Sequence, residues 1–333
     1  MQKTISIIIA IFNRKDELFE LLNSLIAQTD KNFEVIIVDD GSSVDLLPTV
    51  ETFKEMLEIQ YFKKTNSGPG LSRNYGARRA KNDWLVFVDS DVIVEKDYIE
   101  NIKKNLENTD CAAFGGADKA HKGFNILQKA ISYSMTSVFT TGGIRGSKKA
   151  VTRFQPRSFN MGVNKEIFLK IGGFSEMRIG EDPDLSMTIW ENGYQTAFFD
   201  NIGVYHKRRT DLGKFSKQVY QFGCARPILN QRHPNYVKPT FWFPTLFLLG
   251  YVAGILEYFL LHKGFVLACY GIYTFVIFFH ALLLTKNLAI AAQAIITTYI
   301  QMFSYGYGFL ESWVKLNILR MKPEEAFPKH FHK

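Results

Sequence analysis

The chain has 333 residues, of which 47% are hydrophobic and 22% are charged, and its formal net charge is +8. These proportions exclude a disordered or low-complexity chain, and the length suffices for two domains. The mean hydropathy of −0.06 is that of a soluble protein. That average conceals a division, however, because only four charged residues occur between Phe241 and Val314. The composition therefore predicts a soluble head joined to a membrane segment.

The positive charge is concentrated in the middle of the chain, where residues 140–240 contain 16 Lys and Arg against 8 Asp and Glu. This stretch precedes the apolar segment, so anionic lipid headgroups or a phosphate-bearing substrate are its expected partners. No nucleic-acid-binding motif accompanies the charge, and we expect no nucleic-acid partner. The three cysteines have no metal-ligand spacing and fit a reducing compartment.

The apolar run at 5–12 is eight residues long and is followed by a charged segment, which is not the pattern of a signal peptide. We therefore expect a multi-pass protein of the inner membrane whose head faces the cytoplasm.

Strand and helix patterns alternate through the first 110 residues. Buried strands are predicted at 5–12, 33–38, 59–62 and 84–88, and helices at 14–28 and 71–80. Such alternation predicts a parallel sheet with helices on both faces. In sheets of this kind the ligand binds beyond the carboxyl ends of the strands.

The pattern becomes more mixed between residues 111 and 236. We predict an amphipathic helix at 126–139, a strand, turn and helix at 158–171, a helix opening after Gly180, and a strand at 197–206.

Three apolar stretches follow at 241–261, 264–285 and 288–310, each close to the ~20 residues that cross a bilayer. The third is the most polar and either spans the membrane or lies in its interface, so two and three spans both stay open. Basic residues after Val314 favour an even number of crossings. The predicted domains are a head at 1–236, a membrane block at 237–314 and a basic tail at 315–333.

Two acidic clusters stand where predicted parallel strands end. Asp39-Asp40 follows the second strand, and Asp89-Ser90-Asp91 follows the fourth. Aspartate also favours turns and helix caps, but two clusters at the same edge of one sheet favour a functional site. Carboxylate oxygens suit a hard divalent cation such as Mg²⁺, which binds substrate phosphates as well.

Several segments between residues 3 and 206 together resemble the inverting glycosyltransferases of family 2, which have a GT-A fold. In chain order they are ISIIIAIFNR, VDDGSS, NSGPGLSRNYGARRA, WLVFVDSD, FNMGVNK with IGGF, GEDPDLS and VYH. The resemblance implies an α/β fold, Rossmann-like, with a mainly parallel sheet and helices on both faces, followed here by C-terminal transmembrane helices.

The resemblance also implies how a nucleotide-sugar donor is bound. Asp39 is expected to hold the nucleotide base, Arg73 the diphosphate and Asp89 the ribose. Asn13 and Glu181 are placed with these donor-binding residues.

Metal and catalytic roles follow from the same motifs. Asp91 is expected to bind a divalent cation, Mg²⁺ or Mn²⁺. His206 either adds a second metal contact or is an ordinary hydrogen-bonded residue. Asp182, in the acid pair that opens the helix after Gly180, is expected to be the catalytic base that takes the proton of the acceptor hydroxyl.

The expected activity is sugar transfer, with inversion, from a nucleotide sugar to a hydroxyl of a lipid-linked saccharide in cell-surface polysaccharide or glycan biosynthesis. A UDP-sugar is favoured over a GDP-sugar. The Q-x-x-R-W motif of processive synthases is absent at 221–226, so we do not expect a polymer-extruding synthase.

Other readings of the sequence remain open. In one alternative the protein transfers the sugar to polyprenyl monophosphate. In another the head is a catalytically inactive transferase-like domain. A sugar-1-phosphate nucleotidyltransferase would carry a glycine-rich loop after its first strand, and residues 12–16 contain no glycine. Glycoside hydrolysis also uses paired carboxylates, but it gives no reason for the clusters at the strand ends.

Overall fold

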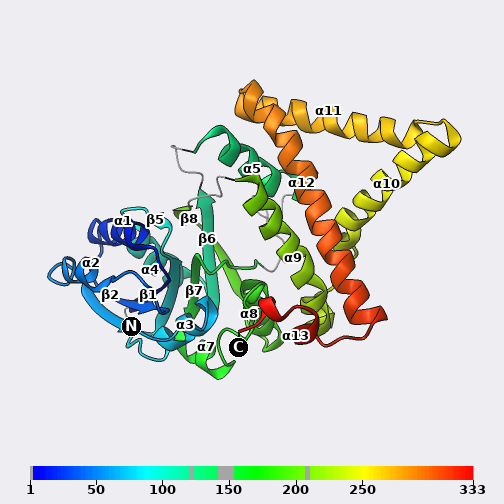
Figure 1. Cartoon of the computed structure of the whole chain (residues 1–333). Coiled ribbons are helices and arrows are strands. Elements are labelled where there is room, and N and C mark those ends of the chain that lie inside the picture. Colours follow the sequence, from blue (N-terminus) through cyan, green and yellow to red (C-terminus); the bar gives the residue numbers. More distant parts are fainter. Residues whose placement is uncertain (1–2, 120–123, 142–153, 207–210, 333) are drawn as a thin grey trace. The chain divides into compact units, whose positions relative to one another are not determined.

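The computed structural model describes residues 3–119, 124–141, 154–206 and 211–332 (Figure 1). Contacts divide the chain into two compact units. The first comprises residues 1–121, 148–207 and 329–333, and the second comprises 122–147 and 208–328. This division assigns the helices at 126–136 and 212–232 to the unit with the apolar helices, whereas the sequence placed them in the head.

The first unit is built on a sheet that has eight strands among the described residues, in the order β3-β2-β1-β4-β7-β6-β8-β5 (Figure 1). The strands are β1 Ile5–Ile11, β2 Phe33–Asp39, β3 Glu58–Lys63, β4 Trp84–Asp89, β5 Val92–Val94, β6 Ala113–Lys119, β7 Asn160–Asn164 and β8 Thr196–His206. Strands β3, β2, β1 and β4 pair in parallel, as predicted. The far half is mixed, because β7 pairs antiparallel with β4 and β6, and β5 pairs antiparallel with β8.

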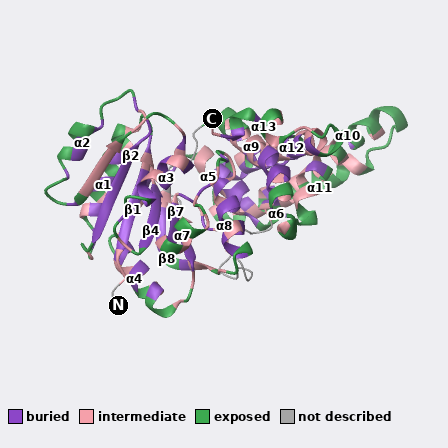
Figure 2. Ribbon diagram, turned by 90° about the horizontal axis from the view of Figure 1, so that it is seen from below, coloured by how far each residue is buried: buried purple, intermediate pink, exposed green. Residues whose placement is uncertain are grey.

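Helices cover both faces of the parallel half, so its central strands are buried, as the purple colouring of Figure 2 shows. The helices of this unit are α1 Lys15–Ile26, α2 Leu47–Glu51, α3 Pro69–Ala77, α4 Tyr98–Asn108, α7 Lys165–Lys170 and α8 Glu181–Glu191. Ile7 and Ile9 of β1 share a core with the buried leucines of α1. Ile8 points the other way, and a Cβ on Gly76 of α3 would lie 2.8 Å from it. The continuous apolar run of β1 is thus required by two covered faces.

The second unit is helical in its described residues. Its helices are α5 Ile126–Thr136, α6 Val138–Thr141, α9 Leu212–Arg232, α10 Phe243–Leu261, α11 Phe265–Thr285, α12 Leu288–Trp313 and α13 Pro323–Ala326. Short helical turns at 234–236, 239–242, 314–318 and 328–330 complete the described elements of the chain.

Helix α12 is the centre of this second unit, because α5, α9, α10 and α11 all pack against it. The hydroxyl of Thr297 donates to the carbonyl of Ala130 on α5 at 3.1 Å. Ser304 bonds Ser216 of α9 at 2.9 Å. Two of the polar residues in the third apolar stretch, Thr297 and Ser304, therefore bond neighbouring helices of the same unit.

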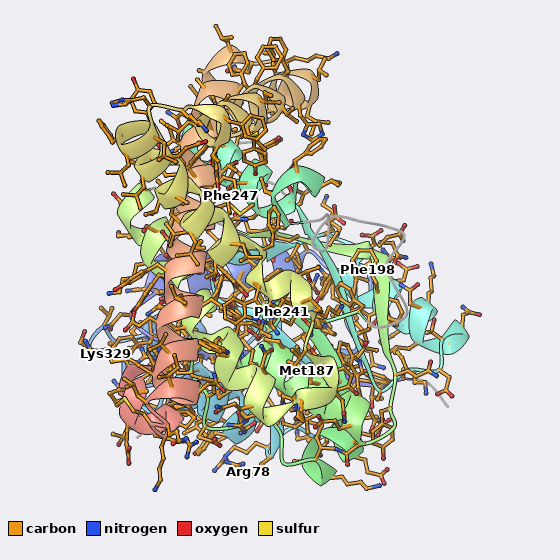
Figure 3. The ribbon with its side chains drawn as sticks, turned by 90° about the vertical axis from the view of Figure 1, so that its right-hand side faces the viewer. Arg78, Met187, Phe198, Phe241, Phe247 and Lys329 are labelled. Carbon is orange, nitrogen blue, oxygen red and sulfur yellow. The ribbon has the colours of Figure 1, made fainter. Side chains whose placement is uncertain are left out.

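Three helices are long and apolar enough to cross a membrane: Pro239–Leu261, Phe265–Thr285 and Leu288–Ile318. Helices α10 and α11 expose most of their length, shown green and pink in Figure 2. Phe247 of α10, labelled in Figure 3, packs its ring against Tyr270, Tyr273 and Tyr299. The three predicted apolar helices are thereby confirmed as helices of suitable length and composition.

Candidate active site

The two acidic clusters lie on either side of β1. In the strand register Ile11 is paired with Asp39, and Ala10 is paired with Asp89. Both clusters therefore occupy the carboxyl edge of the parallel strands, where such sheets bind their ligands. The expectation that they share one edge of one sheet is confirmed.

Asp39 ends β2 with a fully buried side chain. Its Oδ1 accepts the backbone N–H of Ser42 at 2.8 Å, and its Oδ2 accepts the hydroxyl of Tyr61 at 2.7 Å. Burial and the Asp39 carboxylate raise the pKa of Tyr61, which therefore stays a donor. The sequence did not single out Tyr61. Its place on the neighbouring strand, paired with Ile37 two residues before Asp39, is the signal that identifies it.

Asp40 organises the loop that leads into α3. Its carboxylate forms an ion pair with Lys64 and accepts the backbone N–H groups of Ser67 and Gly68 at 2.9 and 2.7 Å. Gly68 has φ +90°, in the left-handed region that favours glycine. Asp40 thus fixes the loop that sets the start of α3.

Asn13 joins the loop after β1 to the loop after β2. Its backbone has φ 54°, its N–H donates to the Ser42 hydroxyl at 2.9 Å, and its Oδ1 accepts the Ser43 N–H at 2.8 Å. The side-chain oxygen of this predicted donor-binding residue is therefore engaged in holding the two loops together.

Arg73 connects three elements of the site. From α3 its guanidinium donates to Asp89 at the end of β4 at 2.7 Å and to Glu181 at the start of α8. It also lies over the ring of Phe174, 5.4 Å from the centroid. A Cβ on Gly70 would lie 2.7 Å from Glu181 Oε2, so a side chain at residue 70 would displace this carboxylate. Three predicted donor-binding residues are thus brought into one buried cluster.

The charges in this cluster influence one another. Burial lowers the pKa of Arg73, but the carboxylates of Glu181, Asp89 and Asp182 raise it overall, so that the guanidinium stays protonated. Burial raises the pKa of Glu181 to about 7, against the lowering effect of Arg73. Asp182 lies in the first turn of α8, where the helix dipole favours a negative charge. Its Oδ1 is buried and has no hydrogen-bond partner among the described residues.

Asp91 lies between β4 and β5, and its Oδ2 accepts a hydrogen bond from Arg14 at 2.6 Å. The backbone of His206, at the end of β8, is paired with that of Val92, directly after Asp91. The side chain of His206 lies outside the described residues. Within the described part of the chain, no group of three or more His, Cys, Asp and Glu residues forms a metal cage. One carboxylate is nevertheless enough for a cation that takes its other ligands from substrate phosphates and water.

A family model described as Glycosyl transferase family 2 matches residues 6–171. An uncharacterized glycosyltransferase of Haemophilus influenzae is 33% identical over 220 residues, which are 62% of this chain and 70% of the relative. An uncharacterized glycosyltransferase of Rickettsia conorii is 41% identical over 103 residues, which are 31% of this chain. The chain covers 17% of the length of that relative.

Solved structures share the fold at low sequence identity. The mannosyltransferase PcManGT from Pyrobaculum calidifontis, in complex with GDP-Man and Mn²⁺, has a TM-score of 0.55 at 19% identity, covering 88% of this chain and 86% of that one. Residues 1–349 of S. aureus TarS in complex with UDP-GlcNAc have a TM-score of 0.50 at 17% identity, covering 92% and 91%. These likenesses confirm the predicted GT-A type of fold. The match to the family model and the Haemophilus relative show that the chain belongs to glycosyltransferase family 2.

Proposed function

We propose that the protein transfers a sugar from a nucleotide-sugar donor to a hydroxyl of a lipid-linked saccharide, with inversion at the anomeric carbon. The observation that carries this proposal is the Arg73 cluster. Through one guanidinium, the acid that ends β4 is joined to the helix that carries Asp182. The groups that bind the donor and the group that accepts the proton therefore belong to one connected site.

The donor side of the proposal rests on Asp39, Asp89 and Arg73. The buried carboxylate of Asp39 is suited to accept a hydrogen bond from an N–H of the nucleobase. Asp89 is suited to accept hydrogen bonds from the ribose hydroxyls, and Arg73 supplies positive charge near the diphosphate. Support also comes from relatives of the fold that were solved with GDP-Man and with UDP-GlcNAc. A UDP-sugar is the donor that we favour.

A divalent cation, Mg²⁺ or Mn²⁺, would be held by Asp91 together with the donor diphosphate, and His206 is a second proposed ligand. When bound, such a cation supplies positive charge that stabilises the departing nucleoside diphosphate. The Pyrobaculum enzyme was solved with Mn²⁺, which supports the proposal. Arg14, now paired with Asp91, is a further positive group for the phosphates.

Asp182 is the proposed base. Its carboxylate takes the proton from the acceptor hydroxyl as the acceptor oxygen bonds to the anomeric carbon and the bond from that carbon to the phosphate oxygen breaks. The electron pair of the broken bond leaves on the nucleoside diphosphate. Attack from the face opposite the leaving group inverts the configuration. A positioned general base contributes roughly 10²–10⁴ to such a rate.

The apolar helices support an acceptor carried by a lipid in the membrane. They support polyprenyl monophosphate as an acceptor equally well, and this is the second candidate function. We place the protein in the inner membrane with its first unit on the cytoplasmic side.

Analysis of the reaction product tests the proposal. The full chain in detergent is given a UDP-sugar or GDP-sugar, Mn²⁺ and a short-chain lipid-linked saccharide or lipid monophosphate. We expect a new glycosidic bond of inverted configuration on the saccharide, and loss of at least 10²-fold in kcat for Asp182→Asn. Asp97→Asn, an exposed acid on the same unit, is the matched control. Transfer to the monophosphate alone would favour the second candidate, and retained configuration would contradict the assignment of Asp182.

A further inference from the structure

Residues 329–332, here called the tail latch, belong to the first unit although the residues before them in sequence belong to the second. They pair with the loop that precedes α8. The N–H of Arg178 donates to the carbonyl of His330 at 2.7 Å, and the N–H of His332 donates to the carbonyl of Glu176 at 2.8 Å. Between these bonds Met177 and Phe331 form an antiparallel bridge. The latch is therefore attached through its backbone in a defined register.

Burial of side chains stabilises the same contact. The side chain of Met177 is fully buried, and Phe331 and His330 are 7% and 5% exposed. Removing a side chain as large as Phe331 from water stabilises the contact through the hydrophobic effect. Both hydrogen bonds and packing therefore hold this segment.

The ring of His332 closes the latch on the loop before α3. A Cβ on Gly68 would lie 1.9 Å from His332 Cε1 and 2.3 Å from Nδ1, so the ring occupies the space that a side chain at residue 68 would fill. Burial and the nearby Arg178 lower the pKa of His332, which favours the neutral ring. The latch thus contacts one loop that is fixed by Asp40 and another that leads to α8.

The loop at 175–178 controls where α8 begins. The hydroxyl of Ser175 donates to Asp184 of that helix at 2.6 Å. Gly180, with φ +88°, is the residue that precedes the first turn containing Glu181 and Asp182. A displacement of residues 176–178 would therefore be passed directly to the two acids.

We propose that the tail latch positions Asp182 for catalysis, with Phe331 as its anchor and His332 as the positioning residue that fixes the distance between the loops at 66–68 and 176–178. The catalytic consequence rests on the proposed function, whereas the structural contact does not. The latch thereby adds a segment that is distant in sequence to the machinery of the transfer reaction.

Hydrogen–deuterium exchange on the full chain tests the contact without reference to activity. Deletion of residues 329–333, Phe331→Ala and His332→Ala are compared with Lys329→Ala, the matched control at an exposed latch residue. We expect amides at 176–184 to exchange at least ten-fold faster in the first three variants and unchanged in the control. Peptides from β1 and β2 report whether the sheet remains folded. If the deletion increases exchange in these peptides, the test of the latch rests on the two single substitutions. Unchanged exchange at 176–184 would overturn the latch, whether or not the protein proves to be a transferase.

Kinetics separate positioning from substrate binding. For His332→Ala we expect kcat to fall about ten-fold or more, with KM for the donor and its Kd unchanged. The His332 ring and a side chain at residue 68 would compete for one space. Gly68→Ala should therefore lower kcat less when His332→Ala is already present than it does alone. Faster exchange with unaltered kcat, or a loss that lies wholly in donor affinity, would overturn the positioning role. A wild-type chain that binds no donor would refute the proposed function and leave the exchange experiment to decide the latch.

Discussion

Arg73 is the residue on which the arrangement of the site depends most directly. Its guanidinium is buried between Asp89 and Glu181 and is their charged partner in the structure. Removing one partner of a buried ion pair leaves the other charge uncompensated, which costs about 3–5 kcal/mol. Both the stability and the activity of the protein should therefore be sensitive to this side chain.

We predict that Arg73→Met lowers the free energy of unfolding by about 3–5 kcal/mol and abolishes transfer. Arg78→Met is the matched control, since Arg78 is exposed at the end of the same helix, α3 (Figure 3). Denaturant unfolding of the full chain in detergent measures both variants. Equal stability of the two would mean that the cluster does not hold the site together.

Glu181 gives the site a dependence on pH. Burial raises its folded-state pKa to about 7 from an ordinary value near 4.5. Because the folded state binds the Glu181 proton more tightly than the unfolded state does, protonation stabilises the fold. This stabilisation is fully present below the unfolded-state pKa and is lost as the pH rises towards 7. We therefore expect the free energy of unfolding to fall between about pH 4.5 and 7, with a slope that Glu181→Gln removes. Glu191 is an exposed acid on the same helix, and the variant Glu191→Gln should keep the slope. Loss of the slope in both variants would mean that a group other than Glu181 causes the pH dependence.

At this scale the sequence predicted the residues but not their partners. Arg73, Asp89 and Glu181 were all expected in donor binding, and the structure brings them into contact. Tyr61 lies outside the motifs, and Arg14 lies at the end of the first motif without an assigned role; what brings them into the site is their place beside Asp39 and Asp91. Such neighbours become visible only once the strand register is known.

Among the elements, α9 and α12 have the closest contact in the second unit. A Cβ on Gly223 of α9 would lie 2.3 Å from the carbonyl oxygen of Tyr305, and one on Gly308 of α12 would lie 2.4 Å from that of Tyr220. Each glycine thus faces the backbone of the partner helix, and a side chain at either position has no space. Small residues permit this kind of close helix packing.

We predict that Gly223→Ala destabilises the second unit by about 1–3 kcal/mol through overpacking. Gly271 of α11 has nothing within 4 Å of such a Cβ, and Gly271→Ala should be neutral or slightly stabilising, because alanine is the better helix former. Thermal unfolding in one detergent compares them. A similar loss for both would show that the close packing of α9 on α12 does not limit stability.

The elements were predictable to the extent that one pattern decides them. The parallel strands follow from continuous apolar runs, and the stripe of leucines on α1 follows from a period of 3.6 residues. The antiparallel pairing of β7 with β4 does not, since strand direction leaves no trace in hydropathy. Helix α9 contains Gly223 and Pro227 and was not predicted as a helix, because its packing against α12 rather than a regular stripe accounts for it.

For the molecule as a whole, the tail latch restricts how the chain can cross a membrane. Residues 330–332 contact residues 176–178 of the first unit, so both must lie on the same side. We therefore predict an even number of crossings, which the basic residues after Val314 also favour. Of the three apolar helices, α12 is the one most buried by protein, which favours α10 and α11 as the crossing pair.

Labelling of single cysteines in sealed vesicles tests this topology. In a chain without its native cysteines, Lys31→Cys and Lys329→Cys should react with an impermeant maleimide from the same side. Lys263→Cys, between α10 and α11, should react from the opposite side. Labelling of residues 31 and 329 from opposite sides would exclude an even number of crossings and the latch with it.

The sequence alone could not predict the latch, because a contact between segments so distant in the chain leaves no periodic signal. Composition sufficed to predict three apolar helices long enough to cross a membrane, since only four charged residues occur between Phe241 and Val314. What composition could not predict is that Thr297 and Ser304 of α12 form hydrogen bonds to α5 and α9.

The central claim is that the strand-end acids form a nucleotide-sugar site, and nucleotide binding tests it most directly. The full chain and its Asp91→Ala variant are titrated with UDP and with GDP, each with and without Mn²⁺, and Asp97→Ala serves as the control for an exposed acid. We predict that UDP binds in the presence of Mn²⁺, that this binding is lost in Asp91→Ala, and that Asp97→Ala retains it. A folded chain that binds neither nucleotide would contradict the account and favour a catalytically inactive head.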